Sequence, residues 1–156
     1  MKDILITDLF TITPSHKNEH KSYEYFKREL VTNSNNGQCA VSVYEIPPGK
    51  SAYPYHFHTQ NEESFYIISG TGLLKAPNSE KIVTAGNFLY FPPGEQGAHK
   101  ITNISKTETL VYIDFDTRNP VDVAFYPDSG KVGIWGKDLG QVFKLCDKTD
   151  YYDDEE

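Results

Sequence analysis

Two histidines and a glutamate lie close together in one segment of the chain. His56 and His58 are two residues apart, and Glu63 follows a short polar stretch. Side chains at positions i and i+2 of an extended strand point to the same face, so both imidazoles would project together. A turn through residues 59–62 would return the chain antiparallel and bring Glu63 beside them. Two imidazoles and one carboxylate that meet at one point suit a borderline divalent metal.

A second segment supplies a further histidine and a similar set of glycines. Together the two segments resemble the motifs of the cupin superfamily, which read Gly, His-x-His, Glu, Gly and then Gly, Pro-x-Gly, His, Asn. The matching residues are Gly49, His56, His58, Glu63 and Gly70, followed by Gly86, Pro92, Gly94, His99 and Asn103. The resemblance covers roughly residues 40 to 115. It implies a metal site formed by three histidines and one glutamate: His56, His58, Glu63 and His99.

The spacing departs from the family pattern at two places. One extra residue lies between Gly49 and His56, and two extra residues lie between Gly94 and His99. Both places are predicted turns, where insertions are tolerated. We therefore expect His99 to keep its place in the site.

Two adjacent carboxylates compete for the fourth ligand position. Six residues separate Glu63 from Gly70, which is the family's spacing, whereas seven separate Glu62 from it. Glu63 is therefore the predicted ligand, and Glu62 either faces solvent or accepts a hydrogen bond that orients an imidazole. Aromatic and apolar residues near the motifs would either line a pocket or belong to the barrel core: Tyr53, Tyr55, Phe65, Phe88, Tyr90 and Ile101.

Short strand-like segments separated by Gly and Pro turns predict an all-β fold. They are residues 39–46, 53–58, 63–69, 73–76, 81–84, 87–91, 99–104 and 107–115. With the resemblance, they predict a cupin-type antiparallel β-barrel (a jelly roll, or double-stranded β-helix) within a single domain, 1–156. The motif-bearing barrel would span about 39–115, with an N-terminal extension over 1–38. A C-terminal segment, 116–156, would pack across the outer face of the barrel or against a second subunit.

The N-terminal extension contains one ambiguous stretch. Residues 23–31 fit a helical period, yet the Asn36-Gly37 pair before the next run is a strong hairpin signal and favours a strand. His16 and His20 have no apolar partners in the sequence, and we expect them on the solvated surface.

Composition limits the partners. The net charge is −7, but five acidic residues lie in the last seven positions, which leaves the rest of the chain near −2. This balance argues against binding to nucleic acid or to an anionic membrane. No apolar run is long enough for a signal peptide or a bilayer span, which predicts a cytoplasmic protein. Exposed edge strands in the N-terminal segment would pair in a homodimer.

The resemblance implies several activities, because isomerases, dioxygenases and decarboxylases all occur in the superfamily. The run Tyr126–Lys131 and the late Asp150-Tyr151-Tyr152 also resemble a branch of single-domain bacterial cupins that mostly lack an assigned function. We predict a small metalloenzyme that uses Mn, Fe, Ni or Zn and acts on a small polar metabolite such as a sugar, a keto acid or a diol. The alternatives are a small-molecule-binding or sensor module without chemistry, and a barrel that has lost its metal.

Overall fold

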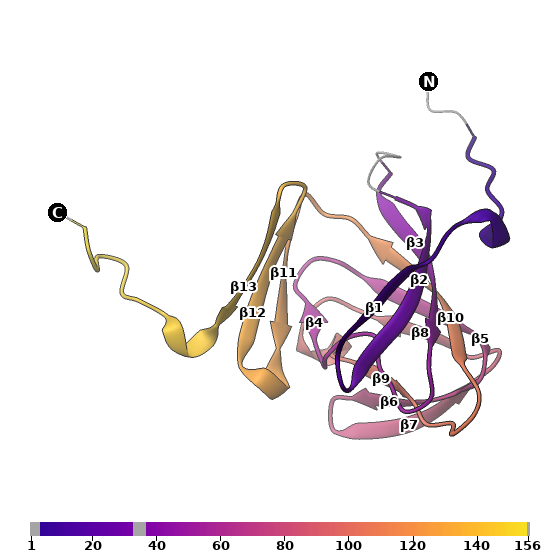
Figure 1. Cartoon of the computed structure of the whole chain (residues 1–156). Helices are drawn as coiled ribbons and strands as arrows, with labels where there is room; N and C mark the ends of the chain where they lie inside the picture. The colour runs from indigo at the N-terminus through magenta and orange to yellow at the C-terminus, as the bar shows by residue number, and fades with distance from the viewer. Residues whose placement is uncertain (1–3, 33–36, 156) are drawn as a thin grey trace.

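The computed structural model describes residues 4–32 and 37–155 and consists mainly of antiparallel strands (Figure 1). The strands in these ranges are β1 (Ser15–His20), β2 (Tyr23–Val31), β3 (Cys39–Ile46), β4 (Phe57–His58), β5 (Glu63–Ser69), β6 (Thr71–Ala76), β7 (Ser79–Thr84), β8 (Phe88–Phe91), β9 (Lys100–Asn103), β10 (Leu110–Thr117), β11 (Val121–Tyr126), β12 (Lys131–Gly136) and β13 (Leu139–Lys144). Short 3-10 helices are η1 (Leu9–Thr11), η3 (Glu95–Gly97), η4 (Pro127–Ser129) and η5 (Leu145–Asp147). Within the described ranges, no helix has the length and apolar character needed to span a membrane.

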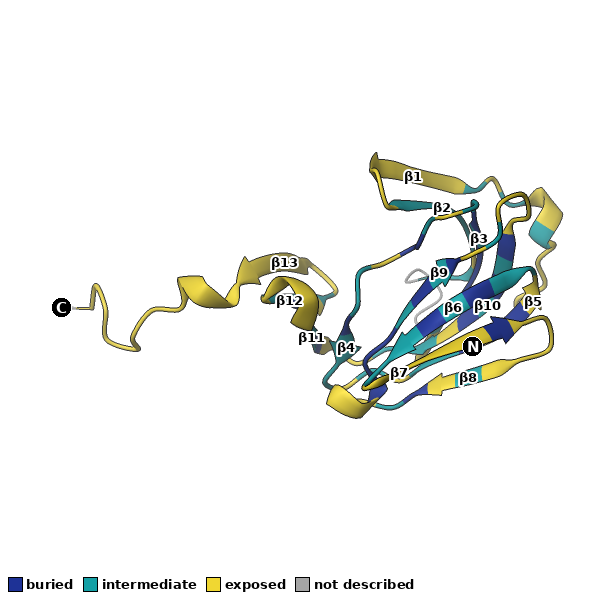
Figure 2. Ribbon diagram, turned by 90° about the horizontal axis from the view of Figure 1, so that it is seen from below, coloured by how far each residue is buried: buried dark blue, intermediate teal, exposed yellow. Residues whose placement is uncertain are grey.

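Three sheets make up the fold. Their strand orders are β1-β2-β3-β10-β5-β8, β7-β6-β9 and β13-β12-β11-β4. The first two sheets face each other across a core to which both contribute side chains. The isolated bridge Ser51–Thr102 joins a loop residue to β9, and His56–His99 joins two loop residues. The buried residues gather on the barrel strands, whereas β1 and β13 are exposed (Figure 2). The predicted all-β cupin-type barrel is confirmed. The stretch 23–31 is the strand β2, paired antiparallel with β3, as the hairpin signal favoured. Most of the predicted Asn-Gly turn, at 33–36, lies outside the described residues.

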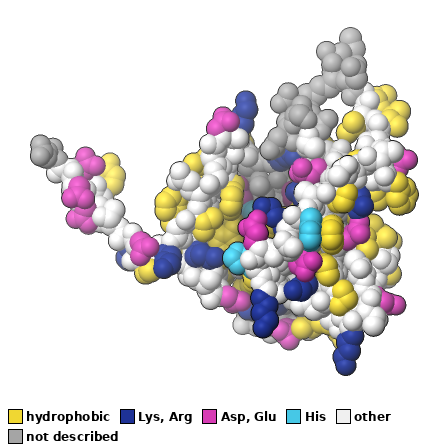
Figure 3. All heavy atoms as spheres, viewed as in Figure 1, with side chains coloured by type: hydrophobic (Ala, Val, Ile, Leu, Met, Phe, Trp, Pro, Cys, Tyr) yellow, Lys and Arg dark blue, Asp and Glu magenta, His cyan; other side chains and the backbone are white. Residues whose placement is uncertain are grey.

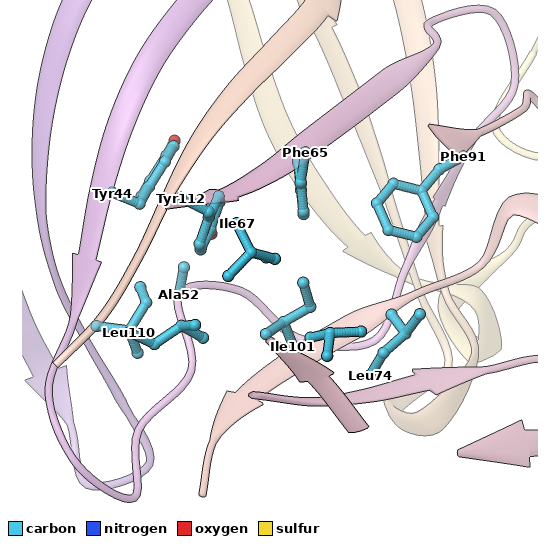
Figure 4. Packing of buried hydrophobic residues seen from close by; sticks show 11 residues of the cluster. Tyr44, Ala52, Phe65, Ile67, Leu74, Phe91, Ile101, Leu110 and Tyr112 are labelled. Carbon is cyan, nitrogen blue, oxygen red and sulfur yellow. The ribbon is translucent and has the colours of Figure 1, made fainter. Parts of the chain in front are cut away.

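The core lies between the two sheets because alternate residues of each strand point inward. Ile46, Ile67 and Leu110 are completely buried, and Figure 4 shows Ile67 among Phe65, Tyr112 and other core side chains. The full buried cluster is Tyr44, Ile46, Ala52, Phe65, Ile67, Leu74, Val83, Phe91, Ile101, Leu110 and Tyr112.

The corner between the two sheets requires a glycine. Gly70 joins β5 to β6 with φ +85, a conformation that L side chains rarely adopt. A Cβ at this position would lie 2.6 Å from the carbonyl oxygen of Thr109. The chain can therefore pass from one sheet to the other here only without a side chain.

The two extensions continue the sheets. β1 and β2 add to the edge of β3, and β1 is exposed along its whole length, so His16 and His20 lie at the surface as expected. The C-terminal segment does not lie across the outer face of the barrel. Instead β11 pairs with β4, and β12 and β13 extend that sheet away from the barrel (Figure 1).

Candidate metal centre

The four predicted ligands converge. Glu63 is the first residue of β5, and its Oε2 lies 3.2 Å from Nε2 of His99, 3.6 Å from Nε2 of His58 and 3.7 Å from Nε2 of His56. One carboxylate oxygen therefore faces three imidazole nitrogens inside the barrel. Ligand atoms of His56, His58 and Glu63 all lie within 4.8 Å of one another. His99, just before β9 (Lys100–Asn103), lies outside this mutually close group and approaches it through Oε2 of Glu63.

Backbone groups fix the orientation of two of the rings. His56 and His99 form a two-way backbone bridge, with N–H to O distances of 3.2 and 2.9 Å. Nδ1 of His56 donates to the carbonyl of Pro54, and Nδ1 of His99 donates to the carbonyl of Gly97, both at 2.9 Å. A carbonyl can only accept, so the proton is on Nδ1 and the Nε2 lone pair is free to bind a metal.

The two extra residues before His99 do not displace it. They are absorbed in the 3-10 turn η3, and His99 is 2% exposed. Gly97 is necessary in this turn, because a Cβ there would lie 1.8 Å from the carbonyl oxygen of Pro92. The longer turn thus keeps the ring of His99 directed toward Glu63.

The third ring depends on a residue that the sequence analysis did not identify. Nδ1 of His58 donates to Oδ2 of Asp122, which lies on β11 and is 2% exposed. The other oxygen of Asp122 accepts from the backbone N–H groups of Gln60 and Asn61, at 2.9 and 3.3 Å. Asp122 therefore orients His58 and also holds the loop that leads to Glu63. The sequence does contain a signal for this role, because Asp122 is the one carboxylate in the otherwise apolar run 121–126.

The remaining predicted residues have other positions. Glu62 is exposed and accepts a hydrogen bond from the Tyr90 hydroxyl at 2.9 Å, so it faces solvent and orients no imidazole. Tyr55 lies under the ammonium of Lys75, in an outer groove. Phe65 and Ile101 are buried core residues, and Phe65 meets the ring of His99 edge-on at 5.4 Å.

Burial favours the neutral form of each ligand in the absence of a cation. It lowers the pKa of His56 to about 4, with a further contribution from His58, and it also lowers the pKa of His99. Burial opposes the charged form of His58 most strongly, but the hydrogen bond to Asp122 and the nearby carboxylates of Glu63, Asp122 and Asp116 together outweigh it and raise the pKa of His58. Burial raises the pKa of Glu63 to about 8. With His56 and His99 neutral, their contacts to Glu63 are not ion pairs.

Two atoms at the centre have no hydrogen-bond partner among the described residues. They are Oε2 of Glu63 and Nε2 of His99, both buried and 3.2 Å apart. Unpaired buried polar atoms are rare in native proteins and call for an explanation such as an ion. Without a cation, the proton that the raised pKa places on Glu63 can be shared with the Nε2 lone pair of His99. A divalent cation that replaces this proton would bind both atoms, so these residues fit the metal that the motifs imply.

A cavity of about 210 Å³ opens beside this group. Its walls are Lys27, Tyr44, Tyr53, His56, His58, Glu63, Asp114, Asp116, Tyr126 and Trp135. The hydroxyl of Tyr53 lies 3.0 Å from that of Tyr44 and 3.3 Å from that of Tyr25. A larger groove of about 790 Å³ shares Tyr53 and Trp135 with the cavity and leads outward between β1 and the C-terminal hairpin. We place the site in the smaller cavity because three of the four candidate ligands, His56, His58 and Glu63, line it.

An antiparallel double-sheet barrel with a cavity at its interior is the architecture of the jelly-roll barrels. Residues 42–116 match the model of the cupin domain family. The fold is that of the cupin superfamily.

Known proteins resemble this chain to different extents. Its fold matches that of a candidate sugar phosphate isomerase from Acidithiobacillus ferrooxidans, with a TM-score of 0.80 and 26% identity over 94% of this chain and 96% of that one. A sugar phosphate isomerase from Silicibacter pomeroyi gives a TM-score of 0.79 at 18% identity, over 94% and 96% of the two chains, which shows the fold alone. An uncharacterized protein of Methanocaldococcus jannaschii is 39% identical over 59 residues, which is 38% of this chain. The match spans 46% of the length of that relative.

Proposed function

We propose that this protein is a small metalloenzyme in which His56, His58, His99 and Glu63 hold a divalent ion beside a small polar metabolite. The observation that carries this proposal is the pair of buried, unpartnered atoms on Glu63 and His99. Three nitrogen ligands and one oxygen ligand suit Mn, Fe, Ni or Zn. A sugar, a keto acid or a diol would be of suitable size for the cavity, and the name of the Acidithiobacillus protein favours isomerisation of a sugar phosphate.

The residues around the ion would have distinct roles. A bound divalent ion polarises a substrate carbonyl or lowers the pKa of a bound water. Neutral His56 and His99 offer their Nε2 atoms because the carbonyls of Pro54 and Gly97 hold the protons on Nδ1. Asp122 does the same for His58. Tyr44 and Tyr53 line the cavity, and because the O–H of Tyr53 donates to Tyr25, their hydroxyl oxygens can accept from a substrate hydroxyl.

The proposal can be tested by combining metal analysis with a substrate screen. Protein purified without an affinity tag should contain close to one divalent ion per chain, and His56→Ala should lose it while remaining folded. His16→Ala is the matched control, because His16 is exposed on β1 and lies against Phe26, away from the cavity. In a screen of sugars, keto acids and diols, turnover should disappear on chelation and in His56→Ala. Turnover that survives chelation contradicts the proposal, and a ligand that raises Tm without forming product favours the binding-module alternative.

A further inference from the structure

Two more carboxylates face the cavity from β10. Asp114 and Asp116 alternate with outward residues on this strand, and Asp116 pairs in register with Glu63 on β5. Asp114 is only 5% exposed. Oδ1 of Asp114 and Oδ1 of Asp116 are buried and have no hydrogen-bond partner among the described residues. Carboxylate oxygens of Asp114, Asp116 and Glu63 all lie within 4.8 Å of one another.

The fold does not require these two carboxylates. A buried carboxylate without a partner is destabilising, and a threonine or valine would suit a half-buried strand better. Lys27 is the one Lys or Arg among the described residues that line the cavity. Its Nζ lies 3.3 Å from Glu29 and over the ring of Tyr44. The candidate metal has four ligands without Asp114 and Asp116, so these oxygens are available to a ligand.

The chemistry of the wall defines what can bind against it. Without a cation, burial raises the pKa of both Asp114 and Asp116, and the two side chains hydrogen-bond to each other. A divalent ion beside them favours their ionised forms. An ionised carboxylate only accepts hydrogen bonds, so in the metal-loaded protein the wall matches hydroxyl donors and repels another anion. The 210 Å³ cavity equals the volume of about seven waters at ~30 Å³ each, which limits the ligand to a small molecule. The Tyr44 and Tyr53 hydroxyls offer additional polar contacts in the same cavity.

We propose that Asp114 and Asp116 form a hydroxyl-binding wall that selects an uncharged, hydroxyl-rich group, such as the diol portion of a sugar, next to the metal. The inference rests on the proposed function and refines its substrate class. A carboxylate or phosphate group is disfavoured at this wall. Asp114 and Asp116 are thus specificity-determining residues, separate from the metal ligands.

The test compares two probes with the same carbon chain, D-ribose and D-ribonate, on metal-loaded protein by titration calorimetry. Asp114→Asn and Asp116→Asn should each weaken ribose binding about tenfold, because a hydrogen bond to a charged acceptor becomes one to a neutral acceptor. Ribonate binding should stay the same or become tighter, because a like charge is removed. Asp138→Asn, at an exposed position between β12 and β13, should change neither affinity.

Several results would overturn the hydroxyl-binding wall. The first is that ribose does not bind the wild-type protein. The second is that neither variant changes the affinity for ribose. The third is that the variants weaken the binding of ribonate as much as the binding of ribose. Two metal ions per chain in the wild type and one in the double variant would assign the pair to a second cation instead. A lower Tm in the metal-free variants would assign it a structural role, because neutralising an unpartnered carboxylate should not destabilise the fold. Wild-type protein without bound metal would contradict the proposed function, whereas normal metal content without this discrimination contradicts the wall alone.

Discussion

Replacing Asp122 by asparagine should weaken metal binding by changing which nitrogen of His58 carries the proton. The amide oxygen of an asparagine could still accept from the N–H groups of Gln60 and Asn61, which now bond to Oδ1. Its NH₂ group would then face Nδ1 of His58, and two donors cannot share this contact. The imidazole would respond by moving its proton to Nε2, which lies 3.6 Å from Glu63 Oε2 and should bind the metal.

Loss of such an orienting partner typically reduces metal affinity about 10- to 100-fold, or roughly 1.4–2.7 kcal/mol. Competition with a coloured chelator would measure the affinity of Asp122→Asn against the wild type, with Asp138→Asn as an exposed control of equal charge change. The metal-free variant should unfold close to the wild type, because the loop hydrogen bonds can persist. Wild-type metal affinity in a folded Asp122→Asn protein would refute the reasoning about the proton on His58.

Three more predictions concern stability and assembly. Burial raises the folded-state pKa of Glu63 to about 8 from its ordinary value of 4.5, so the folded state alone holds this proton between these values and stability falls as pH rises. Between pH 6.5 and 8, the free energy of unfolding measured with urea should fall by about 2 kcal/mol in chelator-treated protein. It should not fall in metal-loaded protein, because the cation keeps Glu63 ionised. Equal pH profiles for the two forms would contradict this. Gly70 and Gly86 both have positive φ, but only Gly70 also approaches Thr109, so Gly70→Ala should be about 1–3 kcal/mol more destabilising than Gly86→Ala in the same assay. We also propose a homodimer, because β1 and β13 end their sheets and are exposed along their length; sedimentation equilibrium should give twice the chain mass, and a monomer at micromolar concentration would exclude it.

Segments with alternating side chains between Gly or Pro turns could be predicted from the sequence. The strands at 39–46 and 63–69 have the predicted limits because half of their residues face the core and the turns beside them are local signals. The strand β1 could not be predicted in this way. All six of its residues are exposed, so it has no alternation, and it is extended because it pairs with β2.

Part of the candidate site could likewise be predicted from local sequence patterns, and part could not. The four ligands belong to short motifs, and their convergence follows from the barrel. Asp122 meets His58 from 64 residues further along the chain, through the pairing of β11 with β4, which no local pattern contains. Asp114 and Asp116 are on the inward face that alternation gives to the last barrel strand. Their approach to Glu63, however, depends on the register between β10 and β5.

The part of the chain after the barrel contributes Asp122 to the candidate metal centre. The C-terminal end of this part projects from the body of the molecule (Figure 3). The segment shared with the cupin family ends at residue 116, whereas β11 begins at Val121. The four candidate ligands thus lie within the matched segment, whereas Asp122, the acceptor that holds a proton on Nδ1 of His58, lies on a strand beyond it. Relatives with identical ligands could therefore diverge in metal affinity and acid sensitivity by exchanging only this appendage. Comparing ligand residues alone would overlook such divergence.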